Sequence, residues 1–103
     1  FRNMVLTSRA VLEEARSEDE AAAVHYLEVA DAWREYGFRL EQAEALLGAG
    51  RCLLVLERSD EAVPALEQAH GIFSELGAQP LLRDAADLLQ KGGALGDVAA
   101  PGA

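Results

Sequence analysis

The sequence predicts an all-α fold of paired helices, and three features support that prediction. Ala, Leu, Glu and Arg, which are good helix formers, dominate the chain. Alternating runs of β-branched residues, which are typical of strands, do not occur in it. Apolar residues recur instead at the three- and four-residue spacing of one helix face. We therefore expect five helices, at about residues 3–16, 19–36, 40–56, 60–76 and 80–91.

The second of these helices has both a start and a stop signal. The stretch "SEDE" has the capping-box spacing, in which Ser17 caps the helix and Glu20 reaches back to the cap. Gly37 follows an aromatic-rich end, where a left-handed closing residue is favoured. The apolar stripe between these signals consists of Ala23, Tyr26, Leu27, Ala30 and Trp33.

The third helix is apolar on more than one side. One stripe consists of Ala43, Leu46, Gly50 and Leu53. Leu47, Leu54 and Val55 lie off that stripe. A helix that is apolar on several sides is typical of a central element, so we expect 40–56 in the middle of the fold.

Ser59 is expected to cap the fourth helix, and two acids follow it at the positive end of the helix. Pro64 lies just beyond the opening turn and should bend the helix or shift its start. Gly77 suits the helix end, and Pro80 suits the first turn of the fifth helix. The apolar stripe consists of Ala62, Leu66, Ala69, Phe73 and Leu76, widened by Ala65 and Ile72.

Composition limits both domain count and partners. The 103 residues fit one domain, which we place at 1–91, followed by a flexible Gly/Ala-rich tail at 92–103. The net charge of −9, with no basic cluster, predicts neither a nucleic-acid nor a membrane partner. The single Cys52 allows no internal disulfide, so we expect a cytoplasmic protein. The start at Phe1 suggests a piece of a longer chain, or a chain that lacks its beginning.

Two segments of the chain resemble each other. "AVHYLEVADAWREYG" ends at Gly37 and "AVPALEQAHGIFSELG" ends at Gly77, with one residue added in the second copy. They are followed by "LEQAEALL" and "LLRDAADLL", each of which predicts an Ala/Leu helix. A period of about 40 residues made of paired helices predicts an α-solenoid.

The order of small and large residues across the third and fourth helices resembles the signature of the tetratricopeptide repeat. The four residues that carry this resemblance are Gly50, Ala62, Leu66 and Ala69. In that family the two helices cross so closely that a leucine in place of such an alanine should cost about 1–3 kcal/mol. The resemblance covers about 43–76 well and about 17–42 in part. Leu46 or Leu53 stands where the family has a large aromatic residue, and "FSELGAQP" replaces the closing proline. A generic helical bundle is the alternative.

A longer stretch, "LLGAGRCLLVLERSDEAVPALEQAHGIF", is similar to the helical repeats that follow the ATPase core in large bacterial regulators. Some of these regulators begin with a nucleotide cyclase domain, and others end in a DNA-binding domain. The resemblance implies a right-handed stack of antiparallel helix pairs. It also implies a non-catalytic module for protein interaction or oligomerisation within a larger cytoplasmic bacterial regulator. The alternative is a regulatory fragment of an enzyme, a nucleotide cyclase or an ATPase-containing regulator whose catalytic domains lie outside this chain.

In tetratricopeptide arrays the first helix of each pair lines a concave groove. Carried onto this sequence, the groove residues are Glu44, Leu47, Arg51, Leu54 and Val55. The three apolar ones should be covered by a neighbouring helix, a partner peptide or a second copy of the chain. The groove lacks the lysines and asparagines of the chaperone-binding members, so we reject that function. In the last helix Leu81, Leu82, Leu88 and Leu89 predict either a cap on the core or a homodimer interface.

No residue pattern predicts catalysis, a metal or a cofactor. The acids Glu13–Glu14 and Glu18–Asp19–Glu20 are expected to be solvated and to match helix dipoles. His25, His70 and Cys52 lack the spacing of metal ligands. "GAGR" lies within a helix, and no Walker-type lysine follows it, because Lys91 is the only lysine. We therefore expect no enzyme, and intrinsic catalysis would have to rest on Glu20 and Glu28.

Overall fold

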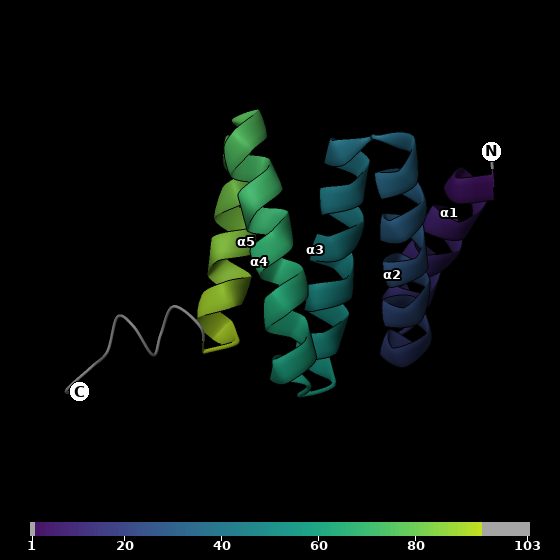
Figure 1. Ribbon diagram of the computed structural model, residues 1–103. Coiled ribbons are helices and arrows are strands. Elements are labelled where there is room, and N and C mark those ends of the chain that lie inside the picture. The colour runs from purple at the N-terminus through teal and green to yellow at the C-terminus, as the bar shows by residue number, and fades with distance from the viewer. Residues whose placement is uncertain (1, 94–103) are drawn as a thin grey trace.

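Five α-helices and no strand make up residues 2–93, the part of the chain that the computed structural model describes. The helices are α1 (Arg2–Ala15), α2 (Asp19–Tyr36), α3 (Arg39–Val55), α4 (Ser59–Leu76) and α5 (Gln79–Lys91) (Figure 1). The all-α prediction is confirmed, and each predicted boundary lies within about one residue of the observed one. Of the predicted tail at 92–103, all but Gly92 and Gly93 lies outside the described residues.

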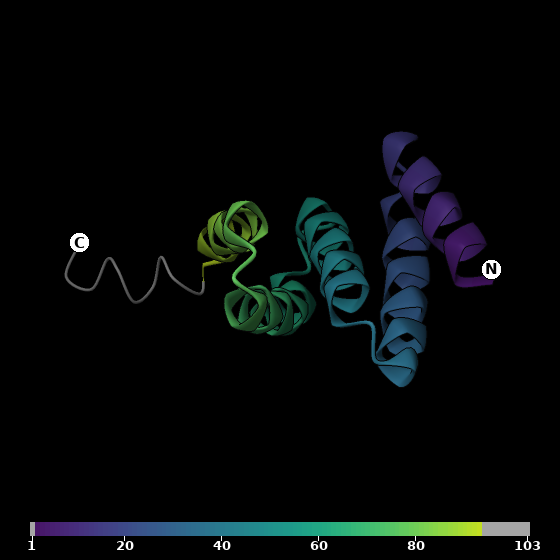
Figure 2. The ribbon, with the colours of Figure 1, turned by 90° about the horizontal axis from the view of Figure 1, so that it is seen from above.

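Each helix packs against the one that follows it in the chain, and α3 also contacts α5. Figure 2 shows the helices as a row, with α3 in the middle and with α4 and α5 on opposite sides of the row. Residues of α3 are buried along most of its length, from Ala43 to Leu53. The prediction of a central third helix is therefore confirmed.

The four connections between helices repeat one design. Each closes the preceding helix with a single residue in the left-handed conformation: Ser17 (φ 61°), Gly37 (φ 77°), Glu57 (φ 59°) and Gly77 (φ 69°). The next residue donates its N–H to a carbonyl five positions back, for example Phe38 to Trp33 at 3.0 Å, as in the Schellman motif. The left-handed residues stand 20 positions apart, so the helix pairs repeat every 40 residues. The predicted closing roles of Gly37 and Gly77 are confirmed.

Both predicted serine caps are wrong. Ser17 closes α1, and the residue before α2 is Glu18, whose side chain makes no capping hydrogen bond. Ser59 is the first residue of α4, which places Arg58 at the cap position. In each turn the left-handed residue closes the preceding helix, and the residue after it takes the cap position. Ser17 therefore lies one residue before the cap of α2, and Ser59 lies one residue after the cap of α4. Arg58 instead donates from Nε and Nη2 to the two carboxylate oxygens of Glu61, at 2.7 and 2.9 Å.

The repeat also contains no inserted residue. In the 40-residue register of the turns, Ala22 corresponds to Ala62, Tyr26 to Leu66 and Trp33 to Phe73, and α2 and α4 each have 18 residues. The predicted insertion is wrong, because pairing the two Ala-Val dipeptides shifts the register by one residue. Pro64 does not move the start of its helix either, since α4 begins at Ser59 and continues unbroken to Leu76.

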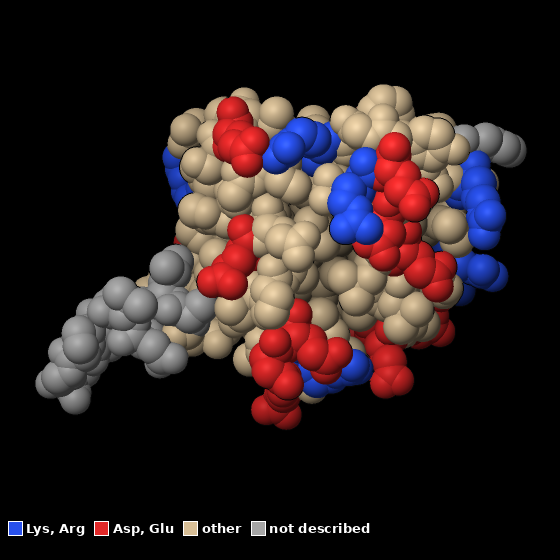
Figure 3. Space-filling model, viewed as in Figure 1, with Lys and Arg blue, Asp and Glu red and all other residues tan. Residues whose placement is uncertain are grey.

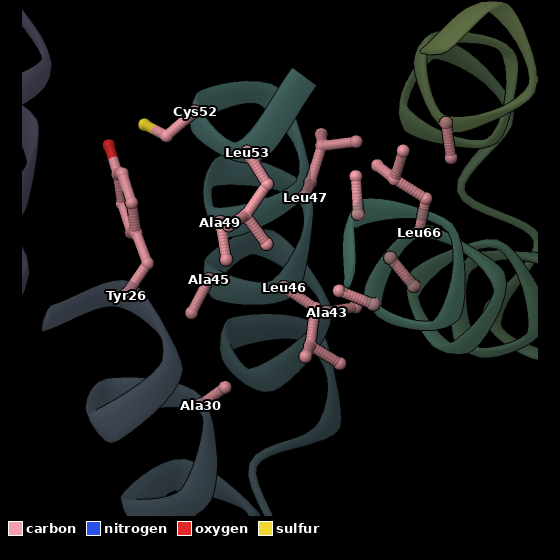
Figure 4. Close-up of a cluster of buried hydrophobic side chains, with 14 of the residues drawn as sticks. Tyr26, Ala30, Ala43, Ala45, Leu46, Leu47, Ala49, Cys52, Leu53 and Leu66 are labelled. Carbon is pink, nitrogen blue, oxygen red and sulfur yellow. The ribbon is translucent and has the colours of Figure 1, made fainter. Parts of the chain in front are cut away.

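Two glycines let α3 approach its neighbours on either side. A Cβ at Gly50 would overlap Cγ and Cδ2 of Leu66 in α4, and a Cβ at Gly48 would lie 2.7 Å from two ring carbons of Tyr26 in α2. Ala62, Leu66 and Ala69 are fully buried at this crossing. Figure 4 shows the same principle between α2 and α3, where small side chains such as Ala30, Ala45 and Ala49 lie between the two ribbons. Small residues on α3 therefore set its distance from both neighbours.

Candidate functional site

An open cleft of about 520 Å³ is the main candidate for a binding site. It lies over α3 and is bordered by α1 and α5, with part of α2 at its base. Below, "the cleft" denotes the space lined by Met4, Thr7, Ser8 and Val11 of α1, Tyr26, Val29 and Trp33 of α2, Glu41, Glu44, Ala45, Leu47 and Arg51 of α3, and Leu81 and Asp84 of α5. Residues from helices far apart in the sequence thus share one surface.

Three of the five residues expected in a groove line the cleft, namely Glu44, Leu47 and Arg51. Leu47 is buried, so its own chain covers it. Leu54 lies elsewhere, partly buried near the end of α5, where a Cβ on Gly92 would lie 3.3 Å from its Cδ2. Val55 is the last residue of α3, is 64% exposed and does not line the cleft. Both residues lie beyond the point on α3 where the cleft ends.

Arg51 is held by a carboxylate from α1. Its Nε donates to Glu14 Oε2 at 2.6 Å and its Nη2 donates to Glu14 Oε1 at 2.9 Å. The hydroxyl of Tyr26 donates to the same Oε1 at 2.8 Å. The hydrogen bonds from Arg51, and secondarily from Tyr26, lower the pKa of Glu14 although burial opposes the shift. Glu14 therefore stays ionised, neutralises Arg51 and joins three helices.

The expectation that Glu13 and Glu14 are solvated is wrong. Glu13 Oε1 lies 2.6 Å from His25 Nδ1, and both side chains are mostly buried. Two successive acids on α1 meet two successive residues on α2, His25 and Tyr26, so neither acid points into solvent. The other predicted cluster behaves as expected, since Asp19 and Glu20 lie in the first turn of α2, where acids match the helix dipole.

One side of the cleft is acidic. Glu41 and Glu44 of α3 and Asp84 of α5 line it, and within residues 2–93 no ion pair engages any of the three. Burial, and then repulsion from Glu41, raises the pKa of Glu44. Because Glu14 already balances Arg51, these carboxylates give the cleft an excess of negative charge. The sequence indicated Glu44 but not Asp84, which reaches the cleft only through the packing of α5.

The leucines of α5 are used within the chain. Leu89 is buried, and Leu81, Leu82 and Leu88 are partly buried against the core. Of these four, Leu81 also borders the cleft. α5 therefore covers the core beside α4, as the first of the two expected alternatives describes.

Three other kinds of group could carry chemistry: metal ligands, the thiol of Cys52, and the carboxylates of Glu20 and Glu28. Among the described residues no three His, Cys, Asp or Glu side chains are grouped to hold a metal ion. Cys52 is fully buried, and its surroundings raise the pKa of the thiol to about 12, chiefly through burial and then through Glu14, so the thiol stays protonated at neutral pH. Glu20 and Glu28 are exposed. No helix within residues 2–93 has the length and apolar character needed to cross a membrane.

No protein-family model matches this chain, and no curated protein or solved structure matches it either.

The chemistry of the cleft follows from its own side chains. It has an apolar floor, a neutral pair formed by Arg51 and Glu14, and an acidic side. Such a surface can bury apolar groups and attract cations.

Proposed function

We propose that this chain is a non-catalytic protein-interaction module that binds a segment of another protein in the cleft. The observation that carries this proposal is an open, apolar-floored cleft built jointly by α1, α3 and α5. These are alternate helices of a 40-residue repeat, the first members of successive pairs. In an array of antiparallel pairs stacked with a right-handed sense, as in tetratricopeptide proteins, such helices would line the concave face.

The repeat length supports a solenoid but differs from that of the tetratricopeptide family. Family repeats have about 34 residues, whereas this chain repeats every 40, because α3 and α4 have 17 and 18 residues. We propose a tetratricopeptide-like array with lengthened helices. The similarity of residues 46–73 to repeats of large regulators extends the proposal to a module of a larger cytoplasmic bacterial regulator.

Binding would use side chains that the chain itself leaves uncovered. Met4 and Val11 of α1 are 65% and 53% exposed at the edge of the cleft. Covering apolar surface contributes about 25 cal/mol per Å², and a preformed cleft on packed helices loses little freedom on binding. A partner segment that covers this wall of α1 would therefore gain affinity without a rearrangement of the fold.

The proposal can be tested by selecting ligands and then blocking the cleft. A displayed library of random peptides of about 16 residues is panned against the full chain. Enriched peptides are then measured against Ser8→Phe, which fills the cleft from an exposed position on α1. Ser74→Phe, at an exposed position on α4 outside the cleft, is the matched control.

We expect Ser8→Phe to weaken binding about tenfold or more, while Ser74→Phe binds like the wild type. Two outcomes would contradict the proposal: peptides that bind both variants equally, or a library from which no peptide is enriched. Sedimentation of the same three proteins would show whether the occupant is a second copy of the chain, as in an oligomerisation module.

A further inference from the structure

We propose that the cleft selects a cationic, amphipathic peptide segment of a partner protein. Its Lys or Arg side chains would lie against Glu41, Glu44 and Asp84. Its apolar side chains would cover Met4 and Val11. This inference rests on the proposed function and adds to it the chemistry of the partner.

The charge of the cleft supports a cation as its occupant. Glu41 and Glu44 lie three positions apart on α3, close enough on a helix face to repel each other. Burial first and Glu41 second raise the pKa of Glu44. The ionised form of this carboxylate is therefore disfavoured, and a nearby cation would stabilise it. Asp84 adds a third negative charge from α5. The only cation among the lining residues, Arg51, is already bound in two places by Glu14.

The distribution of apolar residues supports an amphipathic partner. The wall formed by α1 presents Met4 and Val11, both more than half exposed, while the acids lie on α3 and α5. A segment with one apolar and one basic face matches both walls at once, as an amphipathic segment does in a groove. Charge complementarity at the rim would also raise the association rate and exclude acidic competitors.

Other occupants fit this surface less well. A second copy of the chain has the same net charge of −9, with 9 Lys and Arg against 18 Asp and Glu, so its approach would bring like charges together. Figure 3 shows acidic side chains at several places on one face of the molecule. The last ten residues of this chain, 94–103, contain no Lys or Arg and cannot supply the cation. A small polyamine would satisfy the carboxylates but would leave Met4 and Val11 uncovered.

Trp33 provides a direct signal for binding, because it is the only tryptophan of the chain and it lines the cleft. The probe is a synthetic helix-forming peptide of about 18 residues, with Leu along one face and Lys elsewhere. A matched peptide carries Glu in place of Lys. At about 0.15 M salt we expect the Lys peptide to bind, to shift the Trp33 emission and to bind about tenfold more tightly than the Glu peptide.

Two charge variants separate recognition in the cleft from general attraction to an acidic protein. Glu44→Gln/Asp84→Asn removes two charges from the cleft. Glu67→Gln/Asp87→Asn removes two charges from exposed positions within helices, away from the cleft. We expect the first double variant to weaken binding of the Lys peptide about tenfold and the second to weaken it less than about twofold. Circular dichroism controls for folding, and Glu44→Gln alone, with an expected loss of about threefold, replaces the double variant if that variant unfolds.

Several results would overturn the inference. Equal weakening by both double variants would show attraction by net charge alone. A Trp33 shift produced as strongly by spermidine would indicate a small amine, and self-association abolished by Ser8→Phe would indicate a second copy. Failure of the Lys peptide to bind would also overturn it. If peptides selected from the library still bound in a manner blocked by Ser8→Phe, the proposed function would stand and only the cationic chemistry would fail.

Discussion

The helices α1 and α3 occupy equivalent places in the 40-residue repeat but are buried to very different extents. Ala10 and Gly50 correspond and are both buried, and Gly50 lies against Leu66 of the helix that follows. Yet Ala10 is the single buried residue of α1, whereas nine residues of α3 are buried. Large apolar residues remain exposed on α1 instead: Met4, Val5, Val11 and Leu12.

The difference comes from the neighbours of the two helices. α3 packs against both α2 and α4, while α1 packs mainly against α2. The local sequence of each helix fixes which face is apolar, but only packing decides how much of that face is covered. We infer that α3 and α4 supply most of the stability, and that α1 supplies uncovered surface for the proposed binding.

The largest expected effect comes from Leu66→Ala, which tests the buried side of this comparison. Leu66 of α4 is fully buried against Gly50 of α3, so its truncation leaves a cavity. We expect a loss of about 2–5 kcal/mol in the free energy of unfolding, measured by denaturant titration followed by circular dichroism. A loss below about 1 kcal/mol would show that the crossing of α3 and α4 is loosely packed.

An intermediate effect is expected from Glu14→Gln, which weakens the connection between the two regions. The change removes the charge that holds Arg51, and we expect a cost of about 1–2 kcal/mol at neutral pH. The folded state lowers the pKa of Glu14. Its contribution to the free energy of unfolding is therefore present above pH 4.5, the ordinary pKa, and is lost as the pH falls through the lower pKa of the folded state.

The pH dependence of stability gives the control for this variant. The free energy of unfolding of the wild type should therefore fall more steeply below pH 4.5 than that of Glu14→Gln, as measured by denaturant titration at a series of pH values. Identical pH profiles for the two proteins would mean that Glu14 and Arg51 do not form a stabilising pair in solution.

The smallest effect is expected from Leu12→Ala, the same substitution as in α4 but made on the open face of α1. Leu12 is 49% exposed, so we expect a change of no more than about 0.5 kcal/mol in the free energy of unfolding. A cost as large as that of Leu66→Ala would break the comparison, because it would mean that α1 is covered in solution.

Local patterns predicted the helices well. Apolar spacing and the closing glycines located every helix to within about one residue, and the doubled apolar stripe identified α3 as the central helix. Gly50 was also found from the sequence, because small residues at helical spacing indicate where two helices cross. Each of these signals operates within a few residues of the chain, where helix geometry fixes the spacing.

The features that were missed depend on long-range packing or on details of the turns. Arg51 and Glu14 are 37 positions apart, and nothing local to either residue indicates the partner. Asp84 reaches the cleft only because α5 packs beside α3. The serine caps failed because Ser17 and Glu57 adopt the left-handed conformation that Gly37 and Gly77 adopt, although neither is a glycine.

The close approach of α3 and α4 at Gly50 underlies the core, and a double-mutant cycle tests it most directly. Gly50→Ala should lower the free energy of unfolding of the wild type by about 1–2 kcal/mol. The overlap of the new methyl group with Leu66 costs more than the gain in helix propensity offsets. In a Leu66→Ala background the same change should be neutral or stabilising by up to about 1 kcal/mol, since only the propensity gain remains. An equal cost in both backgrounds would contradict the proposed contact between the two helices.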